Sequence, residues 1–236
     1  MEPLSSDGNG AAIPDAAVLA GLFGPGFVAA VAVPRLVNET LYPEERTHIA
    51  RAVAKRQAEF GTARLCAREV LLQLGRQPCS LVPHADRSPR WPDGIVGSIS
   101  HTAGCCAVVA TVAPDVLSCG LDIERNEPLS AELEPMICTP TERLWLDDCD
   151  QATRAQFGKL FFSAKEAFYK CQYLTTKTLI DFHDVELAID LEGGSFRIQR
   201  LTHGGPLWDR VGLIRGRFLW ISEFIVTAAL LTAGVR

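Results

Sequence analysis

The sequence predicts a fold of the α+β class, in which helices and antiparallel strands occupy separate stretches of the chain. Apolar residues recur at helical spacing in two long segments, residues 44–74 and 155–173. In the last third of the chain, apolar and polar residues alternate with period two, as they do in strand hairpins. With 236 residues, of which 47% are hydrophobic and 22% charged, the chain can bury one large core or two small ones.

The first elements follow a stretch rich in Gly, Ser, Asp and Pro. Residues 1–15 are expected to be flexible, and the apolar run 27–33 is predicted to be a buried strand. A long helix is predicted from Glu44 to Leu74. Gly61 is a candidate interruption of that helix, and Gly75 is its predicted C-terminal cap.

Four prolines predict a loop over residues 76–94, and a stretch of small residues follows at 103–113. Residues 129–146 are expected to form an irregular, mostly helical connection. A helix is predicted for residues 155–173, where aromatic and aliphatic side chains share one face. The predicted strands of this part of the chain cover residues 95–100, 118–124, 185–190, 196–201, 217–222 and 224–231.

The composition argues against nucleic-acid binding, membrane association and a zinc site. The formal net charge of −5 argues against general attraction to nucleic acid or to an anionic membrane. None of the eight cysteines forms a Cys-x-x-Cys pair and most lie in apolar runs, which argues against a zinc site and for a reducing compartment. The N-terminus lacks the pattern of a signal peptide, and no apolar run has the length of a membrane span. A cytoplasmic location is therefore expected.

Two carboxylates on one predicted strand form the first candidate site. In Gly120-Leu-Asp-Ile-Glu124, Asp122 and Glu124 project to the same face, roughly 7 Å apart, because side chains alternate along a strand. Such a pair is costly unless a cation or a basic group neutralises it, and oxygen ligands without nearby histidine or thiolate favour Mg²⁺ or Mn²⁺. Taken alone, the pattern is more often an exposed polar strand face.

The second candidate is the segment 162–170, Phe-Ser-Ala-Lys-Glu-Ala-Phe-Tyr-Lys, on the predicted helix. Glu166 and Lys170 share a face one turn apart, and Lys165 is adjacent to Glu166. Taken alone, this spacing is also that of an exposed ion pair. The third candidate is His101, which ends an apolar strand and for which a structural, hydrogen-bonded role is the ordinary alternative.

The order and spacing of these segments resemble the 4'-phosphopantetheinyl transferase superfamily. The pattern is Gly-Ser-x-Ser-His, then about twenty residues to Gly-x-Asp-Ile-Glu, and then about forty residues to Phe-Ser-x-Lys-Glu-Ala-x-Tyr-Lys. It is most similar to the single-chain type with broad carrier specificity, the surfactin and enterobactin synthetase activators. The segments 51–60, 63–68 and Trp91-Pro-Asp-Gly94 also resemble that subgroup.

The resemblance implies two similar α/β lobes, a pseudo-dimer in which each lobe packs a long helix on an antiparallel sheet and the ligand cleft lies between the lobes. Residues 16–117 would form the N-terminal lobe and residues 118–236 the C-terminal lobe. Because one chain would then contain both lobes, a monomer is expected. No internal sequence repeat is visible between the halves.

The resemblance also implies an activity, the Mg²⁺-dependent transfer of 4'-phosphopantetheine from coenzyme A to a serine of an apo acyl or peptidyl carrier protein, with release of 3',5'-ADP. Such carriers serve fatty acid, polyketide or nonribosomal peptide synthesis, including that of siderophores. Asp122, Glu124 and Glu166 would hold Mg²⁺, or Mn²⁺, beside the pyrophosphate and neutralise charge there. This interpretation depends on the three carboxylates sharing one cation.

The catalytic residues implied by the resemblance are Glu166, Lys165 and Lys170. Glu166 would combine contact to the metal with a role as base, and would take the proton of the carrier serine before its oxygen attacks the β-phosphate of coenzyme A. Lys165 and Lys170 would lie along the phosphates, and one of them would assist the leaving group.

Basic residues earlier in the chain would bind coenzyme A. Arg56 and Arg64 match family positions that grip the 3'-phosphate and adenine end, a task that suits the paired hydrogen bonds of a guanidinium group. The residues implied in binding are Lys55, Arg56, Arg64, Arg87, Arg90, Ser100, His101, Asp122, Lys165 and Lys170. The motif spacing leaves open which of Arg87 and Arg90 faces the nucleotide.

Carrier proteins are acidic, so docking on this acidic chain requires a local basic and apolar surface. The candidate docking segment is 129–146, which contains Met136, Ile137 and Trp145, and core packing explains it equally well.

Two other functions are alternatives to phosphopantetheine transfer. A metal-dependent phosphohydrolase or nucleotidyl transferase would not explain Gly-Ser-x-Ser-His together with the Trp-Pro-x-Gly segment. A non-catalytic coenzyme A or nucleotide-binding regulator would not need three costly carboxylates.

Overall fold

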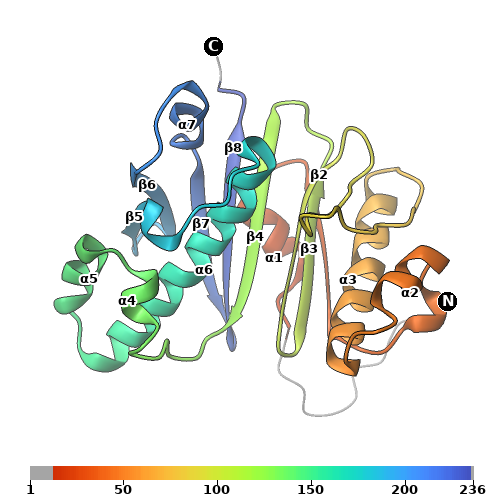
Figure 1. The fold of residues 1–236 in the computed structure, drawn as a ribbon, viewed down its shortest axis with the longest axis horizontal. Helices are drawn as coiled ribbons and strands as arrows, with labels where there is room; N and C mark the ends of the chain where they lie inside the picture. Colours follow the sequence, from red (N-terminus) through yellow and green to blue (C-terminus); the bar gives the residue numbers. More distant parts are fainter. Residues whose placement is uncertain (1–12, 235–236) are drawn as a thin grey trace.

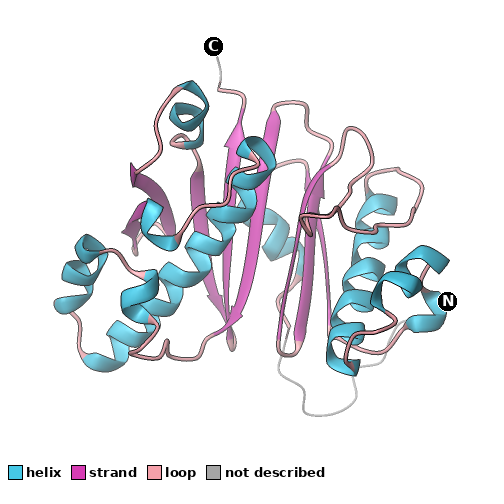
Figure 2. Cartoon of the chain, in the orientation of Figure 1, coloured by secondary structure: helices cyan, strands magenta, loops and turns pink. Residues whose placement is uncertain are grey.

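Two antiparallel sheets stand side by side in the middle of the molecule, with helices packed against them (Figures 1 and 2). The computed structural model describes residues 13–234. The smaller sheet has three strands in the order β1-β3-β2, and the larger has five strands in the order β4-β8-β7-β6-β5. This architecture confirms the predicted α+β class, with a hairpin-rich C-terminal third.

The strands are β1 (Phe27–Ala32), β2 (Val96–Thr102), β3 (Cys105–Thr111), β4 (Val116–Arg125), β5 (Val185–Asp190), β6 (Ser195–Leu201), β7 (Arg215–Ile221) and β8 (Phe224–Thr232). The α-helices are α1 (Ala16–Phe23), α2 (Pro43–Ile49), α3 (Ala54–Gln73), α4 (Glu134–Ile137), α5 (Pro140–Asp147), α6 (Gln151–Thr176) and α7 (Pro206–Val211). Two short 3-10 helices cover Asn38–Thr40 and Phe182–Asp184.

The helix predicted from Glu44 to Leu74 is divided into α2 and α3, so that prediction was wrong in its continuity. The candidate interruption was also wrong, because Gly61 lies inside α3. A Cβ at Gly61 would come within 2.6 Å of a methyl group of Val37, so the glycine allows close packing rather than a break. The predicted cap is confirmed: Gly75 follows α3 with φ +69°.

Two predictions about the first half of the chain need correction. Residues 103–113 were expected only as a stretch of small residues, but they contain β3, the central strand of its sheet. All seven residues of β3 are buried, so the strand lacks the alternation that marks strands with one exposed face. Most of the predicted flexible terminus, residues 1–12, lies outside the described residues, whereas Asp15 caps α1 through hydrogen bonds from two backbone amides.

The two sheets meet along β2 and β4, which lie side by side (Figure 1). β4 is the end strand of its sheet, so the amide groups on its outer edge need partners. The side chain of Ser98 accepts a hydrogen bond from the amide of Leu121 at 2.9 Å, and Ser100 accepts one from Ile123 at 3.3 Å. Two serines spaced by two residues on β2 therefore replace the carbonyl groups of a neighbouring strand.

A shared core also joins the two halves. Buried side chains from α1, β1 and β3 pack with Leu121 and Ile123 of β4 and with Val226 of β8. A separate core lies between α6 and the other face of the larger sheet. The predicted lobe boundary between residues 117 and 118 stays a prediction, because the shared core contains side chains from both predicted lobes.

Six of the eight cysteines are buried and all are free thiols, in agreement with their predicted role as small apolar side chains. Burial raises the pKa of Cys66 to about 12, so this thiol stays protonated. Within residues 13–234, the structure has no helix that combines the length and the apolar character needed to cross a membrane.

Gly120 lets α6 pack directly on β4, the strand that carries Asp122. A Cβ at this position would overlap the carbonyl oxygen of Ala167 and lie 2.7 Å from the amide nitrogen of Cys171. We expect Gly120→Ala to lower the free energy of unfolding by about 3 kcal/mol, because backbone atoms cannot move aside as a flexible side chain can. Urea unfolding followed by circular dichroism measures this change.

Gly21→Ala is the matched control, because it lies in the exposed part of α1 and a Cβ there would meet nothing within 4 Å. It should raise the free energy of unfolding by about 0.5–1 kcal/mol. Equal stability of the Gly120→Ala variant and the parent protein would contradict the close approach of α6 to β4.

Candidate active site

Asp122 is a buried carboxylate where the two sheets and α6 meet. Its side chain is 4% exposed and lies on the face of β4 that α6 covers. One oxygen, Oδ1, accepts hydrogen bonds from Ser100 Oγ at 3.0 Å and Lys170 Nζ at 2.7 Å, and Oδ2 accepts one from Ser163 Oγ at 2.8 Å. These donors offset the cost of burying the charge and hold side chains of β2 and α6 around it.

Lys170 extends from α6 to the contact between the sheets. Besides its ion pair with Asp122, the ammonium group donates to Ser100 Oγ and to the carbonyl of Leu121, both at 3.0 Å. The side chain is still 27% exposed and lines a hollow of about 760 Å³. One side of this ammonium is therefore open to a ligand.

Glu124 and Glu166 are half-buried carboxylates close to Asp122. Burial raises the pKa of Glu124, while a hydrogen bond from Lys159 at 2.8 Å lowers it and the charge of Asp122 raises it. Burial also raises the pKa of Glu166; Lys170 opposes this shift, and Asp122 and Glu124 add to it. The charge of Asp122 thus disfavours the charged forms of Glu124 and Glu166, which is an electrostatic setting that a bound cation relieves.

The expected gathering of Asp122, Glu124 and Glu166 around one point is not present. In the part of the chain that the structure describes, no three His, Cys, Asp or Glu side chains are arranged to hold a metal ion together. Ammonium groups neutralise two of the carboxylates instead, Lys170 on Asp122 and Lys159 on Glu124. The donor set suits Mg²⁺ by its chemistry, but binding one ion would require these two lysines to release their partners.

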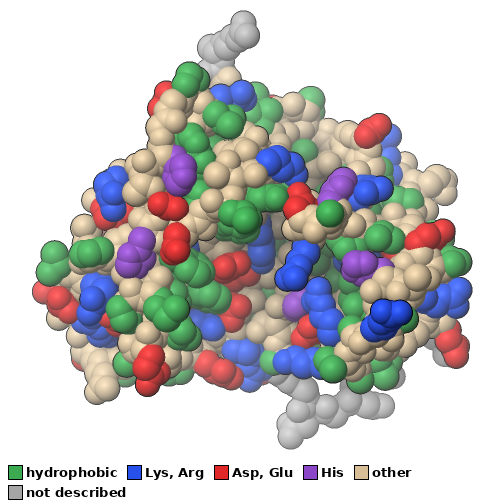
Figure 3. Space-filling view, viewed as in Figure 1, with side chains coloured by type: hydrophobic (Ala, Val, Ile, Leu, Met, Phe, Trp, Pro, Cys, Tyr) green, Lys and Arg blue, Asp and Glu red, His purple; other side chains and the backbone are tan. Residues whose placement is uncertain are grey.

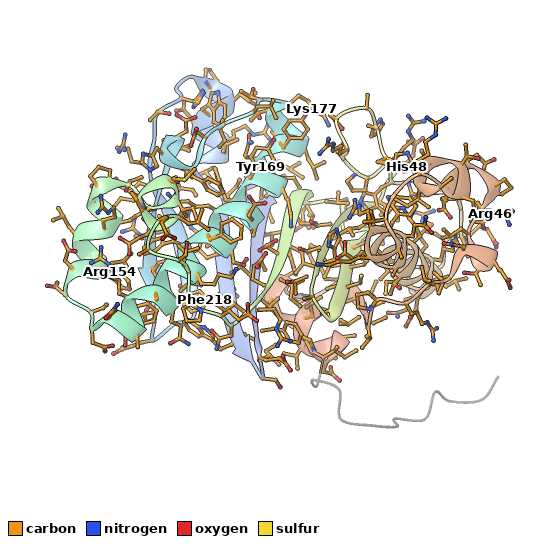
Figure 4. All side chains as sticks on the ribbon, turned by 60° about the horizontal axis from the view of Figure 1, so that its bottom comes forward. Arg46, His48, Arg154, Tyr169, Lys177 and Phe218 are labelled. Atoms are coloured by element: carbon orange, nitrogen blue, oxygen red, sulfur yellow. The ribbon has the colours of Figure 1, made fainter. Side chains whose placement is uncertain are left out.

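Two adjoining hollows open beside this cluster. Figure 3 shows Lys and Arg side chains gathered around the middle of this face, next to acidic side chains and histidine. The hollow of about 760 Å³ lies against α6, and a second of about 680 Å³ lies against α3; Arg87 and Ile99 line both. Tyr169 on α6 lines the first hollow and His48 on α2 lines the second, and Figure 4 shows them on the two sides of this region.

Four of the predicted basic residues line the second hollow: Arg56, Arg64, Arg87 and His101. Arg56 Nη1 lies 2.6 Å from His101 Nε2. Arg64 lies about two helical turns further along α3, on nearly the same face. Burial lowers the pKa of Arg64 to about 10; its guanidinium donates to the carbonyl of Leu81 and lies over the ring of Phe60. Burial also lowers the pKa of His101. The carboxylate of Glu59 lies 3.8 Å from Arg56 and 3.6 Å from His101, and the guanidinium groups of Arg56, Arg64 and Arg87 supply the positive charge that can bind an anion.

Two family profiles match the chain. The first is described as the 4'-phosphopantetheinyl transferase N-terminal domain and matches residues 44–111. The second is described as the 4'-phosphopantetheinyl transferase superfamily and matches residues 118–226. The 4'-phosphopantetheinyl transferase Svp of Streptomyces mobaraensis is 38% identical over 195 residues, which cover 82% of this chain and 79% of that protein. The chain belongs to the 4'-phosphopantetheinyl transferase superfamily.

Other members of the superfamily are also similar to this transferase. PptT of Mycobacterium tuberculosis is 34% identical over 197 residues, covering 81% of this chain and 86% of that protein. Enterobactin synthase component D of Salmonella typhimurium is 34% identical over 140 residues, covering 56% and 55%. A holo-ACP synthase structure from Plasmodium yoelii matches 51% of this chain and 97% of that chain at 18% identity, with a TM-score of 0.39, which is too low to add to the assignment.

Lys165 of this transferase lines neither of these two hollows; together with Glu166 it lines a smaller one of about 320 Å³. Its place along the phosphates therefore stays a prediction. Its ammonium is 1% exposed, pairs with Glu142 at 2.7 Å and donates to the carbonyls of Ile137 and Phe182. Lys170 is five positions after Lys165, which is not a whole number of helical turns, so the two side chains leave α6 on different faces. Lys165 instead connects α6 to the segments before and after it.

Three other predicted ligands of coenzyme A also have positions that differ from the expectation. The hydroxyl of Ser100 donates to Asp122 and accepts from Lys170 and an amide, so it has no proton left for a phosphate. Lys55 and Arg90 are exposed and line neither hollow, whereas Arg87 lines both. Of the two arginines, Arg87 is therefore the one placed to reach a ligand in the hollows, and its contact with the nucleotide stays a prediction.

Sequence reasoning missed Asp86, which holds the loop that carries Arg87. The Asp86 carboxylate accepts hydrogen bonds from the amide and hydroxyl of Ser88, which hold its pKa at about 2, and from the hydroxyl of Tyr173 at 3.2 Å. Lys177 at the end of α6 lies 3.8 Å away. An aspartate two residues before a serine in a proline-rich loop is a turn signal that could have identified this anchor.

The proposed docking segment 129–146 folds into α4 and α5 and contributes to both core and surface. Ile137 is buried at 3% exposure, whereas Met136 is 63% exposed and Trp145 is 37% exposed. Trp145 packs against the rings of Phe157 and Phe161. Ile137 therefore belongs to the core, whereas Met136 and Trp145 are accessible to a partner. Docking of a carrier protein on this segment stays a prediction.

The position of Lys165 predicts a structural role. We expect Lys165→Met to lower the free energy of unfolding by about 3–5 kcal/mol, because it leaves the carboxylate of Glu142 buried without its cation. Lys170→Met should change the free energy of unfolding less, since Asp122 keeps two serine donors. Thermal and urea unfolding of both variants provide the measurement.

A second substitution tests the reason for the loss. Lys165→Met combined with Glu142→Gln removes both charges and should recover part of the lost stability. If the double variant is less stable than Lys165→Met alone, the unpaired charge is not the cause.

Proposed function

We propose that this transferase moves the 4'-phosphopantetheine moiety of coenzyme A to a serine of an apo acyl or peptidyl carrier protein and releases 3',5'-ADP. One observation carries the proposal: the buried Asp122, the half-buried Glu124 and Glu166, and Lys170 lie beside two hollows lined by arginines and histidines. The cluster can serve the reacting pyrophosphate, and the hollows can bind the nucleotide. Relatives named 4'-phosphopantetheinyl transferases that match about four-fifths of the chain support the same reaction.

In this proposal Arg56, Arg64 and His101 bind the phosphate of the nucleotide end in the hollow beside α3. Guanidinium groups suit this task because they make paired, charge-assisted hydrogen bonds to phosphate. Arg87 lies where the two hollows join, so it can reach either the nucleotide or the pyrophosphate. Binding here would place the pyrophosphate near Lys170.

The transfer forms one bond and breaks one. The oxygen of the carrier serine bonds to the β-phosphorus, and the bond from that phosphorus to the oxygen of 3',5'-ADP breaks. Glu166 takes the serine proton, a task for which its raised pKa suits it because a base works best when its pKa is near the operating pH. Lys170 neutralises the charge that develops on the leaving phosphate.

Asp122, Glu124 and Glu166 are the proposed ligands of Mg²⁺, with Mn²⁺ as an alternative. When bound, the ion would neutralise charge on the pyrophosphate. The two lysines that now pair with Asp122 and Glu124 would then be free to contact phosphate oxygens.

Because the reaction is proposed to need this ion, removal of divalent ions by a chelator should abolish transfer, and readdition of Mg²⁺ should restore it.

The proposed partners are coenzyme A and an apo carrier protein of fatty acid, polyketide or nonribosomal peptide synthesis. The protein is proposed to act in the cytoplasm as a monomer, without nucleic acid or membrane. The exposed side chains of Met136 and Trp145 are the proposed apolar contacts for the carrier.

The reaction is tested by incubating the protein with apo carrier protein, coenzyme A and Mg²⁺ and measuring the intact mass of the carrier. A gain of one phosphopantetheine unit is expected. Glu166→Gln should lower kcat by about 10²–10⁴-fold, because the base is lost while its shape is kept. Glu192→Gln, in the exposed turn between β5 and β6, is the matched control and should leave the rate unchanged. Unchanged masses for several carriers would contradict the proposed reaction.

Arg87 and Arg90 form a second matched pair. Arg87→Gln should raise KM for coenzyme A about tenfold or more, because a hydrogen bond to a charged group contributes about 1.5–3 kcal/mol. Arg90→Gln should leave KM unchanged, because its side chain lines neither hollow. Initial rates at varied coenzyme A concentration measure both values, and the reverse order would show that Arg90 faces the nucleotide.

A further inference from the structure

The larger sheet carries a groove on the face opposite α6. This groove has a volume of about 680 Å³ and lies between the end of α1 and strands β5, β6, β7 and β8. α6 packs on the face that carries Asp122, whereas Leu121 and Ala228 face α1. The groove is therefore on the other side of the sheet from the candidate active site.

Three arginines project into this groove from two neighbouring strands. Arg215 and Arg217 are two residues apart on β7, so they share one face, and Arg197 on β6 is the direct neighbour of Arg215 across the sheet. All three side chains are exposed. Arginines this close together repel one another unless an anion lies between them.

No acidic side chain within the described residues 13–234 forms an ion pair with these three arginines. Other arginines of the same sheet are paired, as Arg200 is with Glu186 and Arg125 is with Glu223. Asp190 also lines the groove, but its carboxylate accepts hydrogen bonds from the amide of Gly193 and the hydroxyl of Ser195 in the adjoining turn. The groove thus keeps an excess of positive charge on a chain whose net charge is −5.

Small apolar side chains form the floor between the arginines. Ala188 is the cross-strand neighbour of Arg197, and Ala228 and Leu230 are the neighbours of Arg217 and Arg215. Leu22 and Phe23 of α1 close one side of the groove. Such a surface can contact apolar side chains of a ligand while the arginines pair with its acidic side chains.

We propose that this groove binds an acidic peptide segment of a partner protein in an extended conformation, with Arg197, Arg215 and Arg217 paired to its carboxylates. Alternating acidic and apolar residues match the groove, because an extended chain can point its acidic side chains toward the arginines of β6 and β7 and its apolar side chains in the opposite direction, toward Leu22 and Phe23 of α1. A partner held here leaves the hollows on the other face of the sheet open. The groove would then be a second contact that raises the local concentration of a protein carrying such a segment.

A protein segment fits the groove better than a nucleic acid does. Binding of single strands relies on exposed aromatic rings on which bases stack, and the only aromatic side chains that line the groove among the described residues, Phe23 and Phe196, are buried. The proposal does not depend on the transferase reaction, because none of the three arginines lines either hollow.

The test measures binding of a fluorescein-labelled peptide of alternating Glu and Ala to the full chain by fluorescence anisotropy. Binding should weaken as NaCl is raised from about 0.05 M to about 0.5 M, because salt screens the pairing. The variant Arg197→Gln/Arg215→Gln/Arg217→Gln should bind at least about tenfold more weakly. The matched control, Arg46→Gln/Arg51→Gln/Arg76→Gln, loses the same charge from exposed positions outside the groove and should bind as the parent protein does.

Circular dichroism and the melting temperature establish that both triple variants are folded, and both should keep the transferase rate of the parent protein. Equal loss of binding in the two triple variants, or no binding by the parent protein, would overturn the proposal. Tighter binding of a labelled oligothymidine than of the peptide, lost in the same groove variant, would assign the groove to nucleic acid instead. A failure of the transfer assay would leave this result unaffected.

Discussion

The buried carboxylate of Asp122 on β4 requires hydrogen bonds, and its side-chain donors come from two other elements of the fold. Ser100 arrives from β2, while Ser163 and Lys170 arrive from α6. Because a buried charge without donors is costly, the smaller sheet, the larger sheet and α6 are held in one arrangement at this point. Ser98 adds to the same junction through the amide of Leu121. The candidate active site thus also holds the two sheets and α6 together.

The two faces of the larger sheet carry different surfaces. On one face, α6 and the loop anchored by Asp86 border two hollows that collect positive charge next to the acidic cluster. On the other face, α1 covers the strands near β4 and leaves the arginines of β6 and β7 exposed. A small protein can therefore offer one surface for a reaction and another for a partner without either blocking the other.

Much of the fold could be predicted from local patterns, and the failures have clear causes. β6 and β7 of the C-terminal third each have one exposed face, so their alternation is visible in the sequence. β3 is buried on both faces and lacks that signal. The site was predicted through motif order. The structure brings Asp122 into contact with Lys170 and Arg56 into contact with His101, whereas Lys165 lies on another face of α6 against Glu142. Motif order alone does not say which face of a helix a side chain occupies.

The sequence by itself determined the family, the α+β class and the residue types available for the chemistry, since these depend on motif order and on periodicity along the chain. Only the tertiary structure decided which groups meet. It paired Asp122 and Glu124 with lysines rather than gathering three carboxylates, buried Lys165 against Glu142, and placed Arg87 but not Arg90 on the hollows. These outcomes depend on charges and donors from segments far apart in the chain, whose distances are set by packing and not by local pattern.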